Sequence, residues 1–107
     1  MTLTIELRVN PGKANELYQT LQALLSTIRN AKGCMDCLAN QGVRDVNVHV
    51  LTCDWDSREN FEVYIRSGNG SALIGAIDLL VEEARIQVGS GAKWEGSEVL
   101  KRIRRET

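Results

Sequence analysis

The sequence has little of several residue types that mark common sites and segments. Its 107 residues include one proline and one histidine, with only two tryptophans, two tyrosines and one phenylalanine. A metal site built mainly from histidines is therefore excluded, and any imidazole base must be His49. No apolar run approaches the roughly 18 to 20 residues that a membrane-spanning helix requires. The first residues alternate apolar and polar side chains, unlike a signal peptide, so we expect a cytoplasmic protein with no membrane partner.

An excess of charge of one sign is also lacking. Lysines and arginines number 13, aspartates and glutamates number 14, and the formal net charge is -1. Such a balance gives no general attraction to a phosphate backbone, so we expect no nucleic-acid partner. The basic run at 101–107 is typical of a solvated terminus. The sequence has no glycine-rich phosphate loop or dinucleotide fingerprint, so it indicates no nucleotide cofactor.

The three cysteines are an odd number, which favours reduced thiols over a disulfide framework. Cys34 and Cys37 form a C-x-x-C sequence, but a zinc site would normally include a second ligand pair with similar spacing. The favoured interpretation is therefore ordinary half-buried thiols and no metal. The alternative is a thiol or metal site that includes Cys53. A hairpin turn near position 42 would place Cys34 almost opposite Leu51 and diagonal to Cys53.

The first part of the chain predicts a strand followed by an amphipathic helix. Residues 2–9 alternate, so their apolar side chains share one face of a strand. Residues 14–29 repeat apolar side chains at the spacing of one helical face. Asn10-Pro11-Gly12 separates the two segments, and Gly33 ends the helix. The predicted inward residues are Leu3, Ile5, Leu7 and Val9 in the strand and Leu17, Leu21, Leu24, Leu25 and Ile28 in the helix.

A hairpin follows this helix. A turn at 41–44 leads into the clearest strand of the chain, which ends at Trp55. After the strand, Asp56 or Ser57 is expected to cap a short helix. The strand has two faces, with Val46, Val48 and Val50 on one and Asn47, His49, Leu51 and Cys53 on the other.

The last part of the chain predicts a helix, a strand and a tail. The short helix breaks at 67–70, and a helical pattern resumes over 71–84. Residues 85–88 are expected to form the last strand of a domain that spans residues 1–90. The remaining residues, 91–107, are expected to form a C-terminal tail with a weak helix.

The order strand, helix, strand, strand, broken helix, strand predicts an α+β, ferredoxin-like βαββαβ subunit with an antiparallel sheet. Helices cover only one face of such a sheet. The other face must be solvated or covered by a second copy of the chain. Because the apolar residues of the strand before Trp55 are not confined to one face, we expect a homodimer.

Three short motifs follow one another at a specific spacing. Asn10-Pro11-Gly12 comes after the first strand, Gly33-Cys34 after the long helix, and Trp55-Asp56-Ser57 at the junction of a strand and a helix. In this order the chain resembles the antibiotic biosynthesis monooxygenase domain of the dimeric α+β barrel superfamily. The resemblance covers nearly the whole chain apart from the tail.

The resemblance implies a subunit that pairs sheet to sheet into a dimeric α+β barrel. Members include cofactor-independent oxygenases of aromatic phenols or quinols, haem-degrading enzymes and small proteins without an assigned activity. In cofactor-free chemistry, a deprotonated electron-rich hydroxyarene donates an electron directly to dioxygen. The protein then supplies an apolar cavity, a base and a donor for the anion. We therefore expect a homodimer that acts on a small aromatic substrate and uses no cofactor.

The chain departs from the family at positions that carry this chemistry. Tyr64 stands where quinol-oxidising relatives usually have a histidine, and Cys53 stands where many relatives have a glutamate. Ile74 occupies the position at which haem-degrading relatives need an axial histidine, which argues against haem degradation.

Five residues are the candidates for a site. His49 is the candidate base, and Tyr64 is the candidate donor to a phenolate. Trp55, Asn47 and Phe61 are expected to bind the substrate. Each also has a structural interpretation: Trp55 anchors the junction of strand and helix, and His49 forms hydrogen bonds at a dimer interface.

The placement of His49 depends on strand pairing. If the first and third strands pair, His49 and Asn47 are expected on one face, within reach of Glu6 or Arg8.

The leading functional hypothesis is a cofactor-independent monooxygenase that oxidises a small aromatic or quinol-like compound with dioxygen. The alternative is a non-enzymatic, homodimeric small-ligand-binding protein of the same fold.

Overall fold

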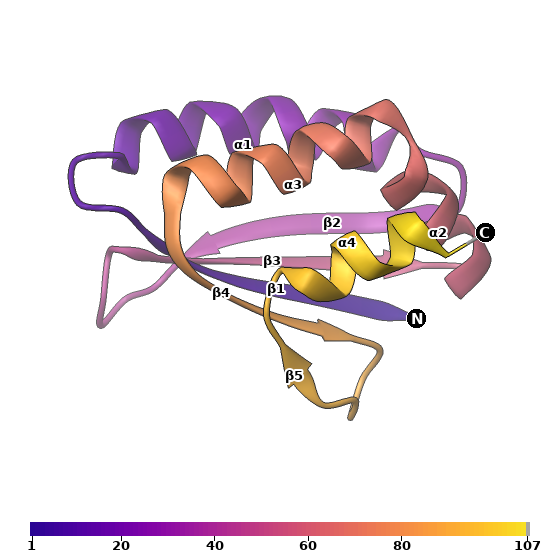
Figure 1. Ribbon diagram of the computed structural model, residues 1–107. Coiled ribbons are helices and arrows are strands. Elements are labelled where there is room, and N and C mark those ends of the chain that lie inside the picture. Colours follow the sequence, from indigo (N-terminus) through magenta and orange to yellow (C-terminus); the bar gives the residue numbers. More distant parts are fainter. Residues whose placement is uncertain (107) are drawn as a thin grey trace.

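The computed structural model describes residues 1–106, which form one antiparallel sheet with helices packed on one of its faces (Figure 1). In the sheet the strands lie in the order β2-β3-β1-β4-β5. The order of elements confirms the predicted α+β, ferredoxin-like βαββαβ fold, with α2 and α3 together in the place of the second helix. The strands are β1 (Thr2–Val9), β2 (Cys34–Gln41), β3 (Val48–Trp55), β4 (Val81–Val88) and β5 (Trp94–Glu95), and the helices are α1 (Ala14–Arg29), α2 (Arg58–Arg66), α3 (Gly68–Leu80) and α4 (Glu98–Arg105).

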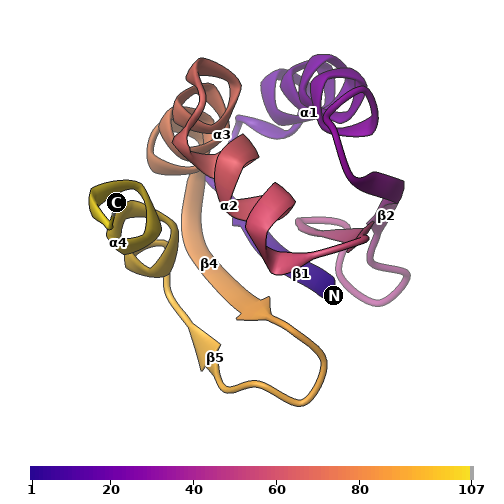
Figure 2. The same cartoon turned by 90° about the vertical axis from the view of Figure 1, so that its right-hand side faces the viewer.

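The molecule has two layers. Figures 1 and 2 show the helices on one side of the sheet, while the described part of the chain places no helix on the opposite side. We call that opposite side the open face. No helix in the described residues is long and apolar enough to cross a bilayer.

Alternation along the strands decides which side chains meet the helices. Burying apolar surface is worth about 25 cal/mol per Å², so a shift of one residue, which would turn the apolar set of β1 away from the helices, is strongly disfavoured. The predicted alternation of β1 and β3 is confirmed, and the valine side of β3, with Val48 and Val50, belongs to the open face. The buried set consists of Leu3, Ile5, Leu7 and Val9 in β1 and His49, Leu51, Cys53 and Trp55 in β3.

The helix α1 has the predicted bounds and the predicted inward face. Its leucines at 17, 21 and 24 and Ile28 are buried against the sheet, and Leu25 is partly buried beside them. The chain turns sharply after α1 at Gly33, whose φ is +90°. An added Cβ there would lie 2.6 Å from the Asp56 carboxylate, so the turn can pack against the start of α2 only with glycine.

The break between α2 and α3 is narrower than the predicted interruption at 67–70. Ser67 alone separates the helices, and its Oγ accepts a hydrogen bond from the Gly70 N–H at 3.2 Å. An added Cβ at Gly70 would collide with the carbonyl oxygens of Tyr64 and Ile65. The glycine thus permits a tight corner between two helices.

The last strand begins earlier than the sequence predicts. The helical pattern extends over 71–84, but α3 ends at Leu80 and β4 begins at Val81 instead of Arg85. The added residues of β4 pair with the end of β1. Pairing along the full length of a central strand therefore outweighs the helical preference of a Glu-Glu-Ala sequence.

The hairpin connection is longer than predicted. Residues 42–47 join β2 to β3, whereas the sequence predicts a turn at 41–44. Hydrogen bonds from the Gly42 N–H to the Val48 carbonyl at 2.8 Å and from the Val48 N–H to the Asp45 carbonyl at 3.1 Å close the connection. The longer connection changes every residue pair in the hairpin.

The longer connection changes the cross-strand partners of the cysteines. Cys37 is the cross-strand partner of Cys53, and Cys34 is the partner of Trp55, so the predicted placement of Cys34 opposite Leu51 is wrong. All three thiols are free, as predicted, with Cys37 and Cys53 buried and Cys34 partly buried. No group of three His, Cys, Asp or Glu side chains in the described residues is placed to hold a metal ion.

The predicted tail, 91–107, packs onto the rest of the molecule up to its last described residue, and Thr107 lies outside the described residues. β5 pairs with β4, and α4 lies against α2 (Figure 2). The Arg104 guanidinium donates to the carbonyl oxygens of Ile65 and Ser67 at 2.7 and 2.9 Å. The predicted helix is therefore present, and three of its side chains join the core, namely Val99, Leu100 and Ile103.

Candidate functional site

A pocket of about 280 Å³ lies between α1 and the neighbouring strands β2 and β3. We call it the His49 pocket. Its wall combines leucines and a tyrosine ring with side-chain amides, a lining that suits a small, mostly apolar ligand. Ala39 has a small side chain on the edge strand β2, which leaves space beneath α1. The lining residues are Tyr18, Leu21, Gln22, Leu25, Ala39, Asn40, Gln41 and His49.

His49 is the buried polar residue of this pocket. Its side chain is 8% exposed, and its Nε2 atom has no hydrogen-bond partner among the described residues. Burial lowers the pKa of His49, so its imidazole is neutral at neutral pH. A neutral imidazole has one nitrogen that accepts and one that donates a hydrogen bond. Buried polar atoms are nearly always paired, so His49 Nε2 is an unusual buried atom whose hydrogen bonding is unsatisfied within the described residues.

The predicted surroundings of His49 are wrong. His49 pairs with Leu7 and lies on the helix-covered face, whereas Arg8 lies on the open face, where its guanidinium bonds the Asp45 carboxylate at 2.7 Å. The sequence analysis placed His49 at a dimer interface, but the structure turns it toward the helices and leaves Val48 and Val50 on the open face. His49 consequently does not lie on the face that a second copy would cover.

Asn47 does not belong to β3. It lies exposed in the connection before the strand, where its N–H donates to the Asp45 carboxylate at 3.0 Å. Asn47 is not among the residues that line the His49 pocket. The structure therefore does not bring it together with the other candidate residues.

Trp55, Phe61 and Tyr64 gather at the opposite end of β3. The rings of Trp55 and Phe61 meet edge to face with centroids 5.9 Å apart, and those of Trp55 and Tyr64 lie 5.7 Å apart. Ser57 caps α2 as predicted, accepting a hydrogen bond from the Asn60 N–H at 3.2 Å. The cap fixes the start of α2, so that Phe61 and Tyr64 lie over Trp55. All three rings are buried and form a packed aromatic cluster.

An open groove of about 430 Å³ runs past the edge of this cluster. We call it the Tyr64 groove. The Thr27 hydroxyl donates to the Leu24 carbonyl at 2.8 Å, so the Tyr64 hydroxyl, 3.0 Å from Thr27 Oγ1, is the donor in that pair. Burial raises the pKa of Tyr64, and the phenol stays protonated. Its lining is Ser26, Thr27, Asn30, Ala31, Lys32, Asn60, Val63, Tyr64, Ser67 and Asn69.

The two candidate catalytic residues lie far apart. His49 and Trp55 are at the two ends of one strand, about 20 Å from each other at ~3.3 Å per residue. His49 lines one pocket and Tyr64 lines the other. One small ligand cannot contact both side chains within a single subunit.

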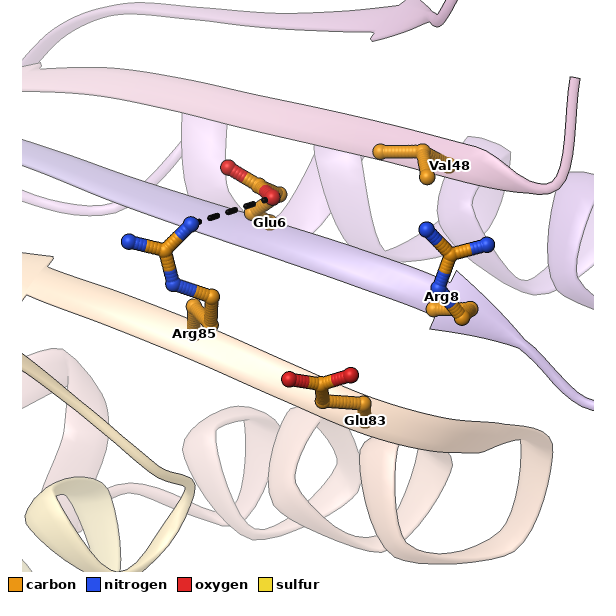
Figure 3. A pocket seen from close by; sticks show the side chains of 5 residues that line it. All are labelled: Glu6, Arg8, Val48, Glu83 and Arg85. Atoms are coloured by element: carbon orange, nitrogen blue, oxygen red, sulfur yellow. Dashed lines mark ion pairs between the residues drawn. The ribbon is translucent and has the colours of Figure 1, made fainter. Parts of the chain in front are cut away.

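The open face carries a third, charged depression of about 210 Å³. Figure 3 shows its five lining side chains, which come from β1, β3 and β4. The Arg85 guanidinium lies 3.5 Å from the Glu6 carboxylate, the ion pair marked in Figure 3. Beside this pair, Arg8 and Glu83 add one further charge of each sign, and Val48 adds an apolar side chain.

The sequence model of the family described as antibiotic biosynthesis monooxygenase matches residues 1–72 of this chain. The chain belongs to the antibiotic biosynthesis monooxygenase family. The predicted resemblance is thereby confirmed. The matched region includes His49, Trp55 and Tyr64 and ends before β4, β5 and α4.

Solved structures show the same fold. PA3566 from Pseudomonas aeruginosa is 21% identical with a TM-score of 0.73, and the alignment covers 80% of this chain and 87% of that one. A conserved protein from Methanosarcina mazei Go1 is 17% identical with a TM-score of 0.75, covering 80% and 86%. A structure described as antibiotic biosynthesis monooxygenase is 11% identical with a TM-score of 0.76, covering 86% and 98%. A comparison with curated proteins finds no match.

Sequence reasoning missed the other residues of the His49 pocket. Tyr18, Gln22 and Leu25 lie on one side of α1, one and two turns apart, and this spacing was a usable signal. Ala39 offered no signal, because a small side chain matters here only through the space that it leaves between two elements. The family match does not by itself assign a role to any of these residues.

Proposed function

We propose that the protein is a cofactor-independent monooxygenase that oxidises a small hydroxyarene or quinol in the His49 pocket. One observation carries the proposal: a neutral, buried imidazole with an unpaired nitrogen lines a pocket with an apolar wall and side-chain amides. Membership of a family of monooxygenases supports the reaction class.

The chemistry follows from the groups present. The neutral His49 imidazole accepts the proton of the substrate hydroxyl, and the resulting imidazolium stabilises the arenolate oxygen. The Gln22 amide is the available donor to the same oxygen, because the Gln41 amide already donates to the Val46 carbonyl at 2.8 Å. The electron-rich ring then bonds to dioxygen at the carbon para to that oxygen. The hydroperoxide formed there loses water, so one oxygen atom ends in the para-quinone and the other in water.

The pocket restricts the substrate. Ligand pockets commonly hold about 300 to 1,000 Å³, and the His49 pocket, at about 280 Å³, lies just below this range. We therefore propose substrates of one or two rings, such as a naphthol with a free para position. In this proposal Tyr64, Trp55 and Phe61 support α2 and do not contact the substrate.

The test compares one substitution in each of two pockets, His49→Gln in the His49 pocket and Tyr64→Phe in the Tyr64 groove. Purified protein is mixed with a panel of naphthols and hydroquinones, and dioxygen consumption is recorded with ¹⁸O₂ label in the product. We expect labelled quinone from the parent and a loss of about 10² to 10⁴ in rate for His49→Gln. The matched control Tyr64→Phe should change the rate less than about twofold, since it removes one hydrogen bond. No turnover by the parent, or equal turnover by His49→Gln, would refute the proposal.

A non-enzymatic ligand-binding protein is the second candidate. It is favoured by the pocket lining, which contains no carboxylate to assist His49. Equilibrium dialysis with 1-naphthol separates the two. Binding that His49→Gln weakens, in a protein that consumes no dioxygen, supports this second candidate and excludes the first.

We further propose that two copies of the chain associate through their open faces. The face combines half-exposed Val48 and Val50 with the ion pair of Glu6 and Arg85, groups that can meet their counterparts across a twofold axis. Sedimentation at micromolar concentration should give a dimer for the parent and a monomer for Val50→Arg. The control Val63→Arg, on the exposed side of α2, should stay dimeric. A monomeric parent would overturn this assignment.

A further inference from the structure

Cys37 and Cys53 face each other across the β2–β3 hairpin. They are direct cross-strand partners, and both side chains are fully buried at 0% exposure. In antiparallel sheets, directly opposed Cα atoms are about 4.5 to 5.5 Å apart. Disulfides span Cα distances of about 4.4 to 6.8 Å. The two thiols can therefore join with little movement of the backbone.

Cys34 is set apart from this pair. The register shifts between Cys34 and Asp36, and Cys34 lies opposite Trp55. Its thiol points to the Asp36 carbonyl, with 3.5 Å between the sulfur and the oxygen. Burial raises the pKa of Cys34. Although it is the more exposed thiol, Cys34 is therefore a weaker nucleophile at neutral pH and serves as a control within the same strand.

The surroundings of Cys37 favour its thiolate. The neighbouring Cys53 thiol lowers the pKa of Cys37, burial opposes this shift, and the Arg29 guanidinium adds to the lowering. Arg29 is held there by its hydrogen bond to the Cys37 carbonyl at 2.9 Å. The neighbouring Cys37 thiol and burial both raise the pKa of Cys53, so Cys53 keeps its proton. Of the two thiols, Cys37 is therefore the one that loses its proton more readily.

Access to this pair is through the edge of the sheet. β2 is an edge strand with a neighbouring strand on one side only, so it can separate from the sheet by breaking its pairing with β3 alone. Opening of β2 brings Cys37 into contact with solvent, while β3 remains paired with β1 in the sheet.

We propose that Cys37 and Cys53 form a dithiol oxidation site that reacts with a peroxide and closes to a disulfide joining β2 to β3. The Cys37 thiolate attacks one peroxide oxygen, the O–O bond breaks, and the leaving alkoxide or hydroxide takes up a proton. The Cys37 sulfenic acid then condenses with the Cys53 thiol and releases water. In total two thiols and one hydrogen peroxide give one disulfide and two waters. This site is independent of the proposed monooxygenase activity.

The experiment treats the purified full-length protein with hydrogen peroxide at neutral pH and follows it by mass spectrometry. We expect a loss of two hydrogens and a cross-linked peptide pair containing Cys37 and Cys53, reversed by a thiol reductant. Hydrogen exchange should slow in β2 after oxidation, because the disulfide prevents its opening.

Two variants make the result decisive. Cys34→Ser should form the same disulfide at an unchanged rate. Cys53→Ala should stop at the Cys37 sulfenic acid, which dimedone traps. The proposal is overturned if Cys34 alone is oxidised, if Cys34 pairs with Cys37, or if both buried thiols of the folded parent remain reduced while the urea-unfolded chain reacts.

Discussion

The two ends of β3 differ although they share one strand face and one alternation pattern. At one end Trp55 is covered by Phe61 and Tyr64 from α2, and three rings fill the space. At the other end His49 lies beneath α1, where small Ala39 leaves a pocket. The residues that look most suited to bind an aromatic compound are packed against one another, and the single imidazole has the space. The elements above a strand, and not the strand itself, decide between packing and binding.

The largest expected effect is a difference in the free energy of unfolding between variants at the two ends of β3. Trp55→Ala removes the ring on which the other two aromatic rings pack, and large-to-small changes of this kind cost about 3 to 5 kcal/mol. His49→Leu should change the free energy of unfolding by less than about 1.5 kcal/mol, since it replaces a polar side chain with an apolar one of similar volume. Urea denaturation measures both. Equal losses would show that the two ends are packed alike.

The second prediction fills each pocket in turn. Ala39→Leu places three more carbon atoms in the His49 pocket and should lower kcat/KM for the naphthol substrate by about 10- to 100-fold, the scale on which a pocket discriminates small apolar groups. The matched change in the Tyr64 groove, Ala31→Leu, should leave kcat/KM nearly unchanged. A larger loss of kcat/KM from Ala31→Leu than from Ala39→Leu would show that the substrate binds in the Tyr64 groove instead.

The third prediction concerns the hydrogen bond at the packed end. Tyr64→Phe breaks the bond between the Tyr64 hydroxyl and Thr27, 3.0 Å in length, but keeps the ring. The expected loss of stability is about 0.5 to 1.5 kcal/mol, the usual net value of such a bond. Thermal unfolding with Thr27→Val and the double variant checks it. If the two losses add fully, the hydroxyls do not interact.

The smallest effect is a pH dependence at the His49 end. Burial lowers the pKa of folded His49 below that of the unfolded chain, so the unfolded state binds the proton first as pH falls. The stability of the parent relative to His49→Gln should be greatest above the unfolded pKa of about 6.5 and should decline as pH falls toward the lowered folded value. Urea titrations of both proteins across this range measure the difference, and a constant difference contradicts burial of a neutral imidazole.

Some features of the fold could be predicted from the sequence and others could not. The bounds of α1, the alternation of β1 and the Ser57 cap follow from local patterns, and the structure has them as predicted. The start of β4 and the length of the hairpin connection do not, because each depends on pairing with a distant strand. The cross-strand partner of Cys34 differs from the prediction because of the longer connection, and the neighbours of His49 differ because the helices cover the other face of β3.

The sequence by itself determined the order of the elements up to β4, the inward faces of β1 and α1 and the family, because periodicity and short motifs act over a few residues. The tertiary structure alone decided which face of β3 the helices cover, which thiols face each other and where a pocket remains. Those features depend on how side chains from separate segments fill a shared volume, and no stretch of the chain carries that information on its own.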